Sequence, residues 1–166
     1  MNIFIFRHGL AVDHGAPGYA DDASRPLTAE GKAKVRQIAR AMEKLELDFD
    51  VILSSPLKRA RQTAEIAAEE LGLKKKVAFS DALTPQGNTK ELVKQLNQLE
   101  AKDIVLVGHE PYLSELISLL VSGRRDFSVE LKKGGLAKLS TDHLEHGRCA
   151  SLVWLLTPKQ MALMAG

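Results

Sequence analysis

The sequence predicts a single-domain α/β protein with a mostly parallel central sheet and helices on both faces. Short apolar runs alternate with stretches that repeat apolar residues at helical spacing. Three of the runs also end abruptly in polar residues of catalytic type. In a parallel sheet, ligands bind at the edge formed by the carboxyl ends of the strands, so these residues are placed to contact a ligand. The three runs are residues 3–6 before Arg-His-Gly, residues 51–53 before Ser-Ser-Pro and residues 104–107 before Gly-His-Glu.

The composition is that of an ordinary soluble globular protein, with 166 residues, 45% hydrophobic and 27% charged. We therefore expect one domain over residues 1–166. The net charge of +2 provides no general attraction to nucleic acid or to anionic membranes. A single cysteine, Cys149, excludes an internal disulfide and fits a reducing compartment. No apolar run has the length of a signal-peptide core or a membrane span, so we expect a cytoplasmic protein, and a monomer because no exposed heptad is visible.

The first half of the chain is expected to contain two strands and two helices. Residues 11–26 have small, acidic and turn residues without apolar periodicity, which indicates a long loop after the first strand. From Thr28, apolar residues recur at helical spacing. After the strand at 51–53, Pro56 is expected to open a helix capped by Ser55 and ended by Gly72. The expected buried stripe of that helix is Leu57, Ala60, Ala64, Ala67 and Leu71.

The second half continues the alternation. A short strand is expected at residues 77–79, and Asn88 with Glu91 resembles a capping pair before the next helix. After the strand at 104–107, Pro111 opens a helix with Leu113, Leu116, Ile117 and Leu120 on one face. Two strands follow, around residues 136–139 and 152–156, whereas the pattern at 122–133 is weak.

His8 is the first candidate for chemistry. A neutral imidazole nitrogen can attack phosphorus and form a covalent intermediate. Arg7 beside it can neutralise phosphate charge, and Gly9 permits close approach of the backbone to a ligand. The alternative is a histidine that only forms hydrogen bonds at a strand end. The two further strand ends of the same kind favour the functional interpretation.

His109 and Arg59 complete a predicted phosphoryl-transfer site with His8 and Arg7. A protonated His109 at a helix start can hold a phosphate oxygen, although a capping or core histidine is the alternative. Arg59 lies one turn into its helix, where the helix N-terminus also favours an anion. Lys58 and Arg61 compete for this role, but the apolar neighbours of Arg59 favour Arg59.

Other polar residues point less clearly to function. Asp13 and His14 with His8 lack a metal-ligand spacing, so no metal is expected, and the role of His14 stays open. Arg25 is either solvated or a supplementary phosphate contact. The basic pairs Arg124–Arg125 and Lys132–Lys133 are interpreted as surface charge, with contact to an acidic partner as the alternative.

Several motifs resemble those of the histidine phosphatase superfamily, whose members include phosphoglycerate mutases. They are Arg7-His8-Gly9, residues 25–31 (RPLTAEG), residues 54–64 (SSPLKRARQTA) and Val107-Gly108-His109, and the resemblance runs from Asn2 to Trp154. The resemblance implies a phosphoglycerate mutase-like fold with His8 as the phosphorylated nucleophile. It also implies that Arg7, Arg59, His109 and Gly9 surround the phosphate and that no cofactor is needed.

The short chain and Leu83-Thr84-Pro85 resemble one branch, the SixA-type phosphohistidine phosphatases. Pro85 stands where mutase-like members place a glutamate general acid. A phosphohistidine needs such an acid less than an ester does, because imidazole, with a pKa of about 6.5, is a better leaving group than an alkoxide. The resemblance thus implies hydrolysis of phosphohistidine on a partner protein. A phosphatase for small phosphate esters is the alternative, and a binding module without turnover is disfavoured.

Glu110 is a candidate general acid that complicates this contrast. Some acid-phosphatase branches carry an aspartate directly after the second histidine, and Glu110 is similarly placed. The alternative is a carboxylate at a helix start, where the helix dipole favours negative charge. Both interpretations stay open at this point.

Overall fold

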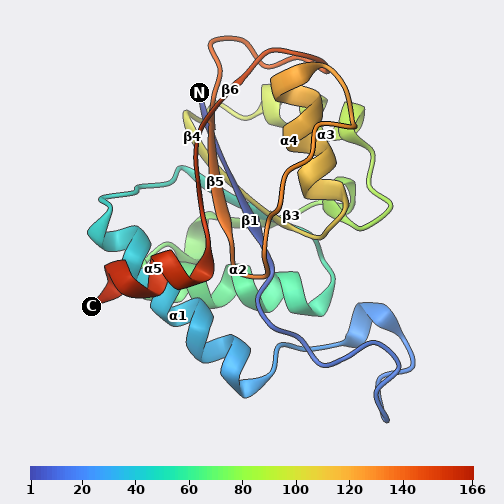
Figure 1. Ribbon diagram of the computed structural model, residues 1–166, viewed down its shortest axis with the longest axis vertical. Coiled ribbons are helices and arrows are strands. Elements are labelled where there is room, and N and C mark those ends of the chain that lie inside the picture. The colour runs from blue at the N-terminus through green and yellow to red at the C-terminus, as the bar shows by residue number, and fades with distance from the viewer.

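The computed structural model describes all residues from Met1 to Gly166 and contains one six-stranded sheet in the order β3-β2-β4-β1-β5-β6 (Figure 1). The strands are β1 (Asn2–Arg7), β2 (Val51–Ser54), β3 (Val77–Phe79), β4 (Asp103–Gly108), β5 (Leu136–Ser140) and β6 (Ser151–Leu156). The α-helices are α1 (Ala29–Lys44), α2 (Lys58–Glu70), α3 (Thr89–Gln98), α4 (Tyr112–Ser122) and α5 (Pro158–Ala165).

The sheet is mixed but mostly parallel, as predicted. Strands β1 to β4 pair in parallel, whereas β5 runs antiparallel to both β1 and β6. In the register, Arg7 at the end of β1 lies opposite Gly108 at the end of β4, and Ser54 of β2 lies opposite Val107. The three polar strand ends singled out in the sequence therefore meet at one edge of the sheet.

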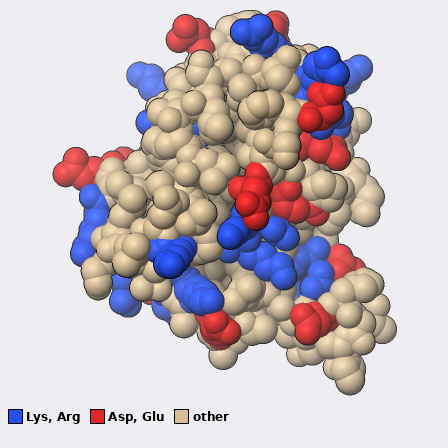
Figure 2. Space-filling view, viewed as in Figure 1, with Lys and Arg blue, Asp and Glu red and all other residues tan.

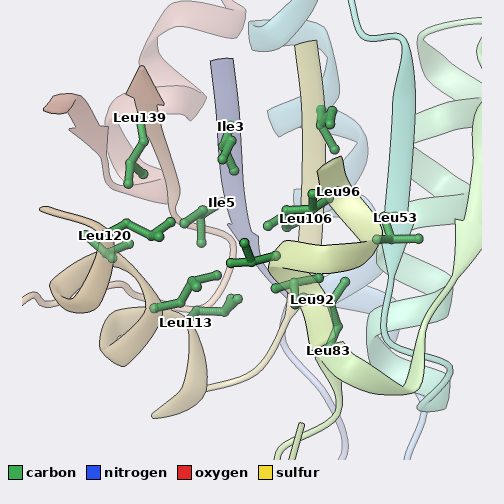
Figure 3. Close-up of a cluster of buried hydrophobic side chains, with 14 of the residues drawn as sticks. Ile3, Ile5, Leu53, Leu83, Leu92, Leu96, Leu106, Leu113, Leu120 and Leu139 are labelled. Atoms are coloured by element: carbon green, nitrogen blue, oxygen red, sulfur yellow. The ribbon is translucent and has the colours of Figure 1, made fainter. Parts of the chain in front are cut away.

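Helices cover both faces of this sheet, as expected from the alternation of the sequence. In Figure 1, α1, α2 and α5 lie on one side of the strands, and α3 and α4 lie on the other. Because side chains alternate along a strand, β1 directs Ile3 and Ile5 into one core and Phe4 and Phe6 into the other. Figure 3 shows Leu113 and Leu120 of α4 pointing toward Ile5 in the first of these cores.

Side chains cap the starts of two helices, and the cap at Asn88 was predicted from the sequence. Thr28 caps α1 by accepting a hydrogen bond from the Gly31 N–H, and Asn88 caps α3 by accepting from Lys90 and Glu91. Each side chain satisfies backbone donors that the first helical turn leaves unpaired. The α1 helix is thereby held directly after the loop that follows β1.

The start of α2 differs from the prediction. The helix begins at Lys58 rather than at Pro56, and no side chain caps it. The Ser55 hydroxyl does accept a hydrogen bond from the Leu57 N–H at 3.3 Å, but it also contacts His109. The buried stripe also differs, because Arg59 and Thr63 are buried while Leu57 and Leu71 are only partly covered. The C-terminal end agrees, since Gly72 adopts φ +70° there.

The C-terminal helix α5 was not predicted from the sequence. Thr157 and Gln160 form a capping box at its start, and the buried Met161 joins the core beneath α1. Its other apolar residues are poorly covered, and Leu163 is 76% exposed. The apolar pattern is therefore too weak for sequence periodicity to reveal. No helix of the protein has both the length and the apolar character needed to cross a membrane.

Candidate active site

His8 lies at the carboxyl end of β1, buried to 6% exposure. Its Nδ1 is 2.7 Å from the Gly9 carbonyl oxygen, so in the neutral ring Nδ1 carries the proton and donates it to that oxygen. Nε2 is then left with a free electron pair, and it accepts a hydrogen bond from Nε of Arg59 at 3.3 Å. Burial, supported by the charges of neighbouring cations, lowers the pKa of His8 to about 3. The ring is therefore neutral at physiological pH, with Nε2 in the state that a nucleophile requires.

Arg59 is the basic residue of α2 that reaches His8. Its side chain is 5% exposed, whereas Arg61 is exposed and pairs with Glu65 at 2.8 Å. Lys58 is also exposed. The choice of Arg59 over its two neighbours, made from the apolar residues around it, agrees with this geometry.

Asp22 accepts hydrogen bonds from the two terminal nitrogens of the Arg59 guanidinium, whereas Nε of Arg59 faces His8. Arg59 donates from Nη1 to the Asp22 carbonyl at 2.9 Å and from Nη2 to its carboxylate at 3.1 Å. Partial burial acts to raise the pKa of Asp22, but hydrogen bonds and charge from Arg25 and Arg59 outweigh it and lower the pKa to about 2. Asp22 lies in the long loop between β1 and α1, and no pattern in the sequence distinguishes it from the other acidic residues there.

Arg25 and His14 both contact the Asp22 carboxylate. Arg25 donates from Nε to Asp22 at 2.8 Å and from Nη1 to the Val12 carbonyl at 2.6 Å. The His14 ring, largely exposed, lies 3.3 Å from Asp22. In this structure Arg25 braces the loop and holds Asp22, and contact of Arg25 with a phosphate stays a prediction.

Arg7 and His109 each carry a buried nitrogen without a hydrogen-bond partner in the protein. Arg7 donates from Nη1 to the Leu131 carbonyl at 3.0 Å, but its Nε is unpaired. The Nε2 of His109 is 2.8 Å from the Ser55 hydroxyl, while its Nδ1 is unpaired. Buried polar groups in native proteins are almost always satisfied, so two such nitrogens in one cluster indicate an anion-binding site.

The two histidine rings face the same space. Their centroids are 5.2 Å apart, and His109 is 1% exposed. Burial and then the charge of Arg59 lower the pKa of His109 to about 3. A bound phosphate would add negative charge beside this ring and favour its protonated form. The structure thus brings His8, Arg7, Arg59 and His109 together, as the sequence predicts.

Gly9 is placed by packing against α1. A Cβ atom there would lie 2.8 Å from Cγ2 of Val35, so only glycine fits without a shift. Its N–H donates to the Thr63 hydroxyl at 3.1 Å, and Thr63 in turn donates to the Arg59 carbonyl at 2.7 Å. Thr63 therefore ties the turn that carries His8 to the helix that carries Arg59. Its buried place on α2 was not recognised from the sequence.

Glu110 follows His109 and is half-buried. Its carboxylate accepts hydrogen bonds from the Ser114 N–H at 3.1 Å and from the Ser114 hydroxyl. Burial raises its pKa, although Ser114 and Arg7 oppose the effect. The hydrogen bonds are those of a carboxylate at a helix start, and the raised pKa is a property that a general acid requires. Both interpretations made from the sequence remain compatible with this geometry.

The turn that contains Pro85 borders the end of β4. The backbone oxygen of Leu83 lies 3.3 Å from the position that a Cβ on Gly108 would take. Leu83 is fully buried and Pro85 half-buried, so this turn forms a wall beside the His109 strand end. Pro85 follows Leu83 in this turn and has no side-chain group that can donate a proton.

Comparison with known proteins adds the family. Residues 3–84 match the model of the histidine phosphatase superfamily, branch 1. The chain is 41% identical over 143 residues to an uncharacterised protein of Picosynechococcus sp., covering 84% of each chain. It is 30% identical over 126 residues to the phosphohistidine phosphatase SixA of Escherichia coli (strain K12), covering 74% of this chain and 76% of that one.

Solved structures agree with these relatives. The structure of the protein histidine phosphatase SixA complexed with tungstate matches with a TM-score of 0.83 and 26% identity, covering 96% of this chain and 98% of that chain. An alpha-ribazole phosphatase from Shigella flexneri shares the fold, with a TM-score of 0.72 and 18% identity over 95% of this chain and 97% of that chain. Four motifs in order, the shared fold and these relatives lead to one conclusion: the chain belongs to the histidine phosphatase superfamily and is a SixA-like hydrolase within it.

Proposed function

We propose that this protein hydrolyses phosphohistidine on a partner protein through a covalent phosphohistidine intermediate on His8. The state of His8 is the observation that carries the proposal. Its Nδ1–H donates to the Gly9 carbonyl, so its Nε2 is unprotonated and its electron pair accepts only the hydrogen bond from Arg59 Nε at 3.3 Å. The similarity to SixA, a phosphohistidine phosphatase by name, supports the choice of substrate.

The reaction consists of two displacements at phosphorus. His8 Nε2 attacks the phosphorus and a new N–P bond forms. The N–P bond of the substrate, whose ring carries a proton on its other nitrogen, breaks with its electron pair remaining on the ring, which leaves as neutral imidazole. Water then attacks the phosphorus on His8, the second N–P bond breaks with its electron pair returning to Nε2, and the protons of the water leave with the inorganic phosphate. His8 keeps its proton on Nδ1 and is regenerated as the neutral ring. Arg7, Arg59 and His109 offset the negative charge on the phosphoryl oxygens in both steps.

The polar residues around the site fit an N–P substrate. Imidazole leaves without the strong proton donor that an alkoxide requires. Pro85 contributes no acid, and the Glu110 carboxylate is engaged with Ser114. A site with these groups is expected to cleave N–P bonds more readily than phosphate esters.

A phosphatase for small phosphate esters is the second candidate function. The raised pKa of Glu110 is the specific observation that favours it, because a protonated carboxyl next to His109 can supply the proton that an alkoxide needs. On this alternative Glu110 acts as the general acid, and the fold shared with an alpha-ribazole phosphatase is compatible with it.

Rapid-quench trapping with a labelled phosphohistidine peptide tests the proposal. We expect acid-labile phosphate on His8 within one turnover and no label or turnover in His8→Ala. His143→Ala, which changes an exposed histidine, is the matched control and should keep full activity. Label on another residue, or higher catalytic efficiency with sugar phosphates than with any phosphohistidine peptide or protein, would contradict it.

A further inference from the structure

A cavity of about 460 Å³ lies directly behind the turn that carries His8. It is bounded by α1, by the start of α5 and by the loop that precedes β5. Its apolar lining comes from Leu10, Val35, Ile38 and Ala162. This volume is within the range of cavities that take a small ligand or a few side chains of a partner.

The charged residues of the lining are all basic. They are Arg7 and four lysines, Lys34, Lys132, Lys133 and Lys159. Lys34 pairs with Glu30 at 2.7 Å, whereas the other three are exposed and form no ion pair. Figure 2 shows basic side chains across the lower half of this face, with several acidic side chains among them, whereas the centre of the upper half is uncharged. A protein with a net charge of only +2 therefore concentrates cations around an apolar hollow.

The cavity shares one wall with the phosphate cluster, which consists of Arg7, His8, Arg59 and His109. The Leu131 carbonyl accepts a hydrogen bond from the Arg7 guanidinium at 3.0 Å, and the lysines at 132 and 133 follow directly. Gly134 then donates to the backbone carbonyls of Arg7 at 3.1 Å and His8 at 3.2 Å. The segment that places two cavity lysines is therefore bonded on its inner side to the residues that form the phosphate site.

We propose that this cavity docks a segment of the partner protein that combines acidic residues with an apolar side chain, next to the phosphohistidine. The proposal rests on the proposed function. The apolar lining fits one aliphatic or aromatic side chain, and the unpaired lysines attract the carboxylates around it. The cavity adjoins the phosphate site, because Arg7 and Gly9 belong to its lining whereas His8, Arg59 and His109 do not, so an occupant of both must extend beyond the phosphorylated side chain. A segment of polypeptide has that reach, and a small phosphate ester does not.

Binding of unphosphorylated peptides tests the docking site independently of catalysis. The probes are two histidine-centred peptides of equal length with Leu at matched positions, one flanked on both sides by Glu and the other by Gln. We expect the Glu peptide to bind roughly tenfold more tightly at low salt, with the difference shrinking as salt rises. The double variant Lys132→Glu/Lys159→Glu should abolish the preference.

The matched control is Lys75→Glu/Lys102→Glu, which makes the same change in net charge. These two exposed lysines precede β3 and β4, so they lie at the opposite edge of the parallel strands from the site. The control should keep the preference for the Glu peptide. Equal loss in both double variants, or equal binding of the two peptides by the unmodified protein, would overturn the docking site.

Turnover of the phosphorylated peptides separates this inference from the proposed function. The ratio of kcat/KM for the phosphorylated Glu peptide to that for phosphoramidate should fall roughly tenfold in Lys132→Glu/Lys159→Glu and stay constant in the control. A constant ratio in both variants would overturn productive docking while phosphohistidine hydrolysis stands. Selective binding of the Glu peptide without hydrolysis of any phosphohistidine would refute the proposed function and leave the docking site supported.

Discussion

The Asp22 carboxylate lies 3.1 Å from Nη2 of Arg59, whose Nε lies 3.3 Å from Nε2 of His8. A residue of the loop between β1 and α1 thereby sets the orientation of the guanidinium beside His8. In Figure 1 this loop projects away from the helices and the sheet, so its contact with Arg59 links a peripheral segment to the centre of the site. Asp22 is best described as a positioning residue, because it reaches His8 only through Arg59.

Replacement of Asp22 should reduce activity through the orientation of Arg59. We expect Asp22→Asn to lower kcat for a phosphohistidine peptide by roughly tenfold, since a misplaced donor loses part of its effect on transition-state charge. Steady-state kinetics measure the change. Asp13→Asn, at an exposed position in the same loop, is the control and should be neutral. A fall in Asp22→Asn that is seen only in KM would contradict the positioning role.

Replacement of Ser55 should affect His109. The Ser55 hydroxyl is the hydrogen-bond partner of His109 Nε2, and the other ring nitrogen is unpaired in the protein. In Ser55→Ala the ring loses this constraint, so we expect kcat to fall by roughly ten- to a hundredfold while circular dichroism stays unchanged. Ser54→Ala changes the neighbouring buried serine, which donates to the Ser55 carbonyl at 2.9 Å and touches neither histidine. Equal loss in both variants would point to packing instead.

The free energy of unfolding should decrease as the pH is lowered, because two buried histidines stay neutral in the folded protein. Both pKa values are lowered from 6.5 to about 3, so the unfolded chain binds protons first as the pH drops. The stabilisation is complete above pH about 6.5 and is lost progressively toward pH about 3. Between pH 7 and pH 5 each ring should account for about 2 kcal/mol of lost unfolding free energy.

Denaturant unfolding at the two pH values measures this effect. His8→Asn and His109→Asn should each reduce the difference between pH 7 and pH 5 by about 2 kcal/mol, whatever their own effect on stability. His143→Asn changes an exposed histidine and should leave the difference unchanged. The interpretation fails if the pH dependence is the same in all three variants.

Glu110→Gln separates the two interpretations of this residue. Glutamine keeps an oxygen that can accept from Ser114 but carries no acidic proton. If Glu110 is a general acid, hydrolysis of glycerol phosphate should fall by roughly a hundredfold or more while phosphohistidine turnover changes little. If it only caps α4, both activities should stay within about twofold. Glu115→Gln, in the first turn of α4, is the matched control.

Much of the fold was predictable from local patterns. Apolar runs and helical periodicity located all six strands and four of the five α-helices, and the strand ends placed His8, His109 and Arg59 at one edge. These predictions succeed because strand alternation, helix caps and the common edge of parallel strands depend on residues close together in the sequence. The start of α2 was misplaced because Ser55 contacts His109 in addition to the turn before the helix.

The sequence by itself determined the α/β class, the order of the elements and the four residues expected at the site. Tertiary structure alone decided which nitrogen of His8 is free, because that depends on the Gly9 carbonyl and on Arg59, 51 residues away. It also decided the partners Asp22, Ser55 and Thr63, whose side chains approach the site from segments far apart in the chain. Hydrogen bonds and burial depend on distance in space, and residue spacing along the chain does not specify that distance.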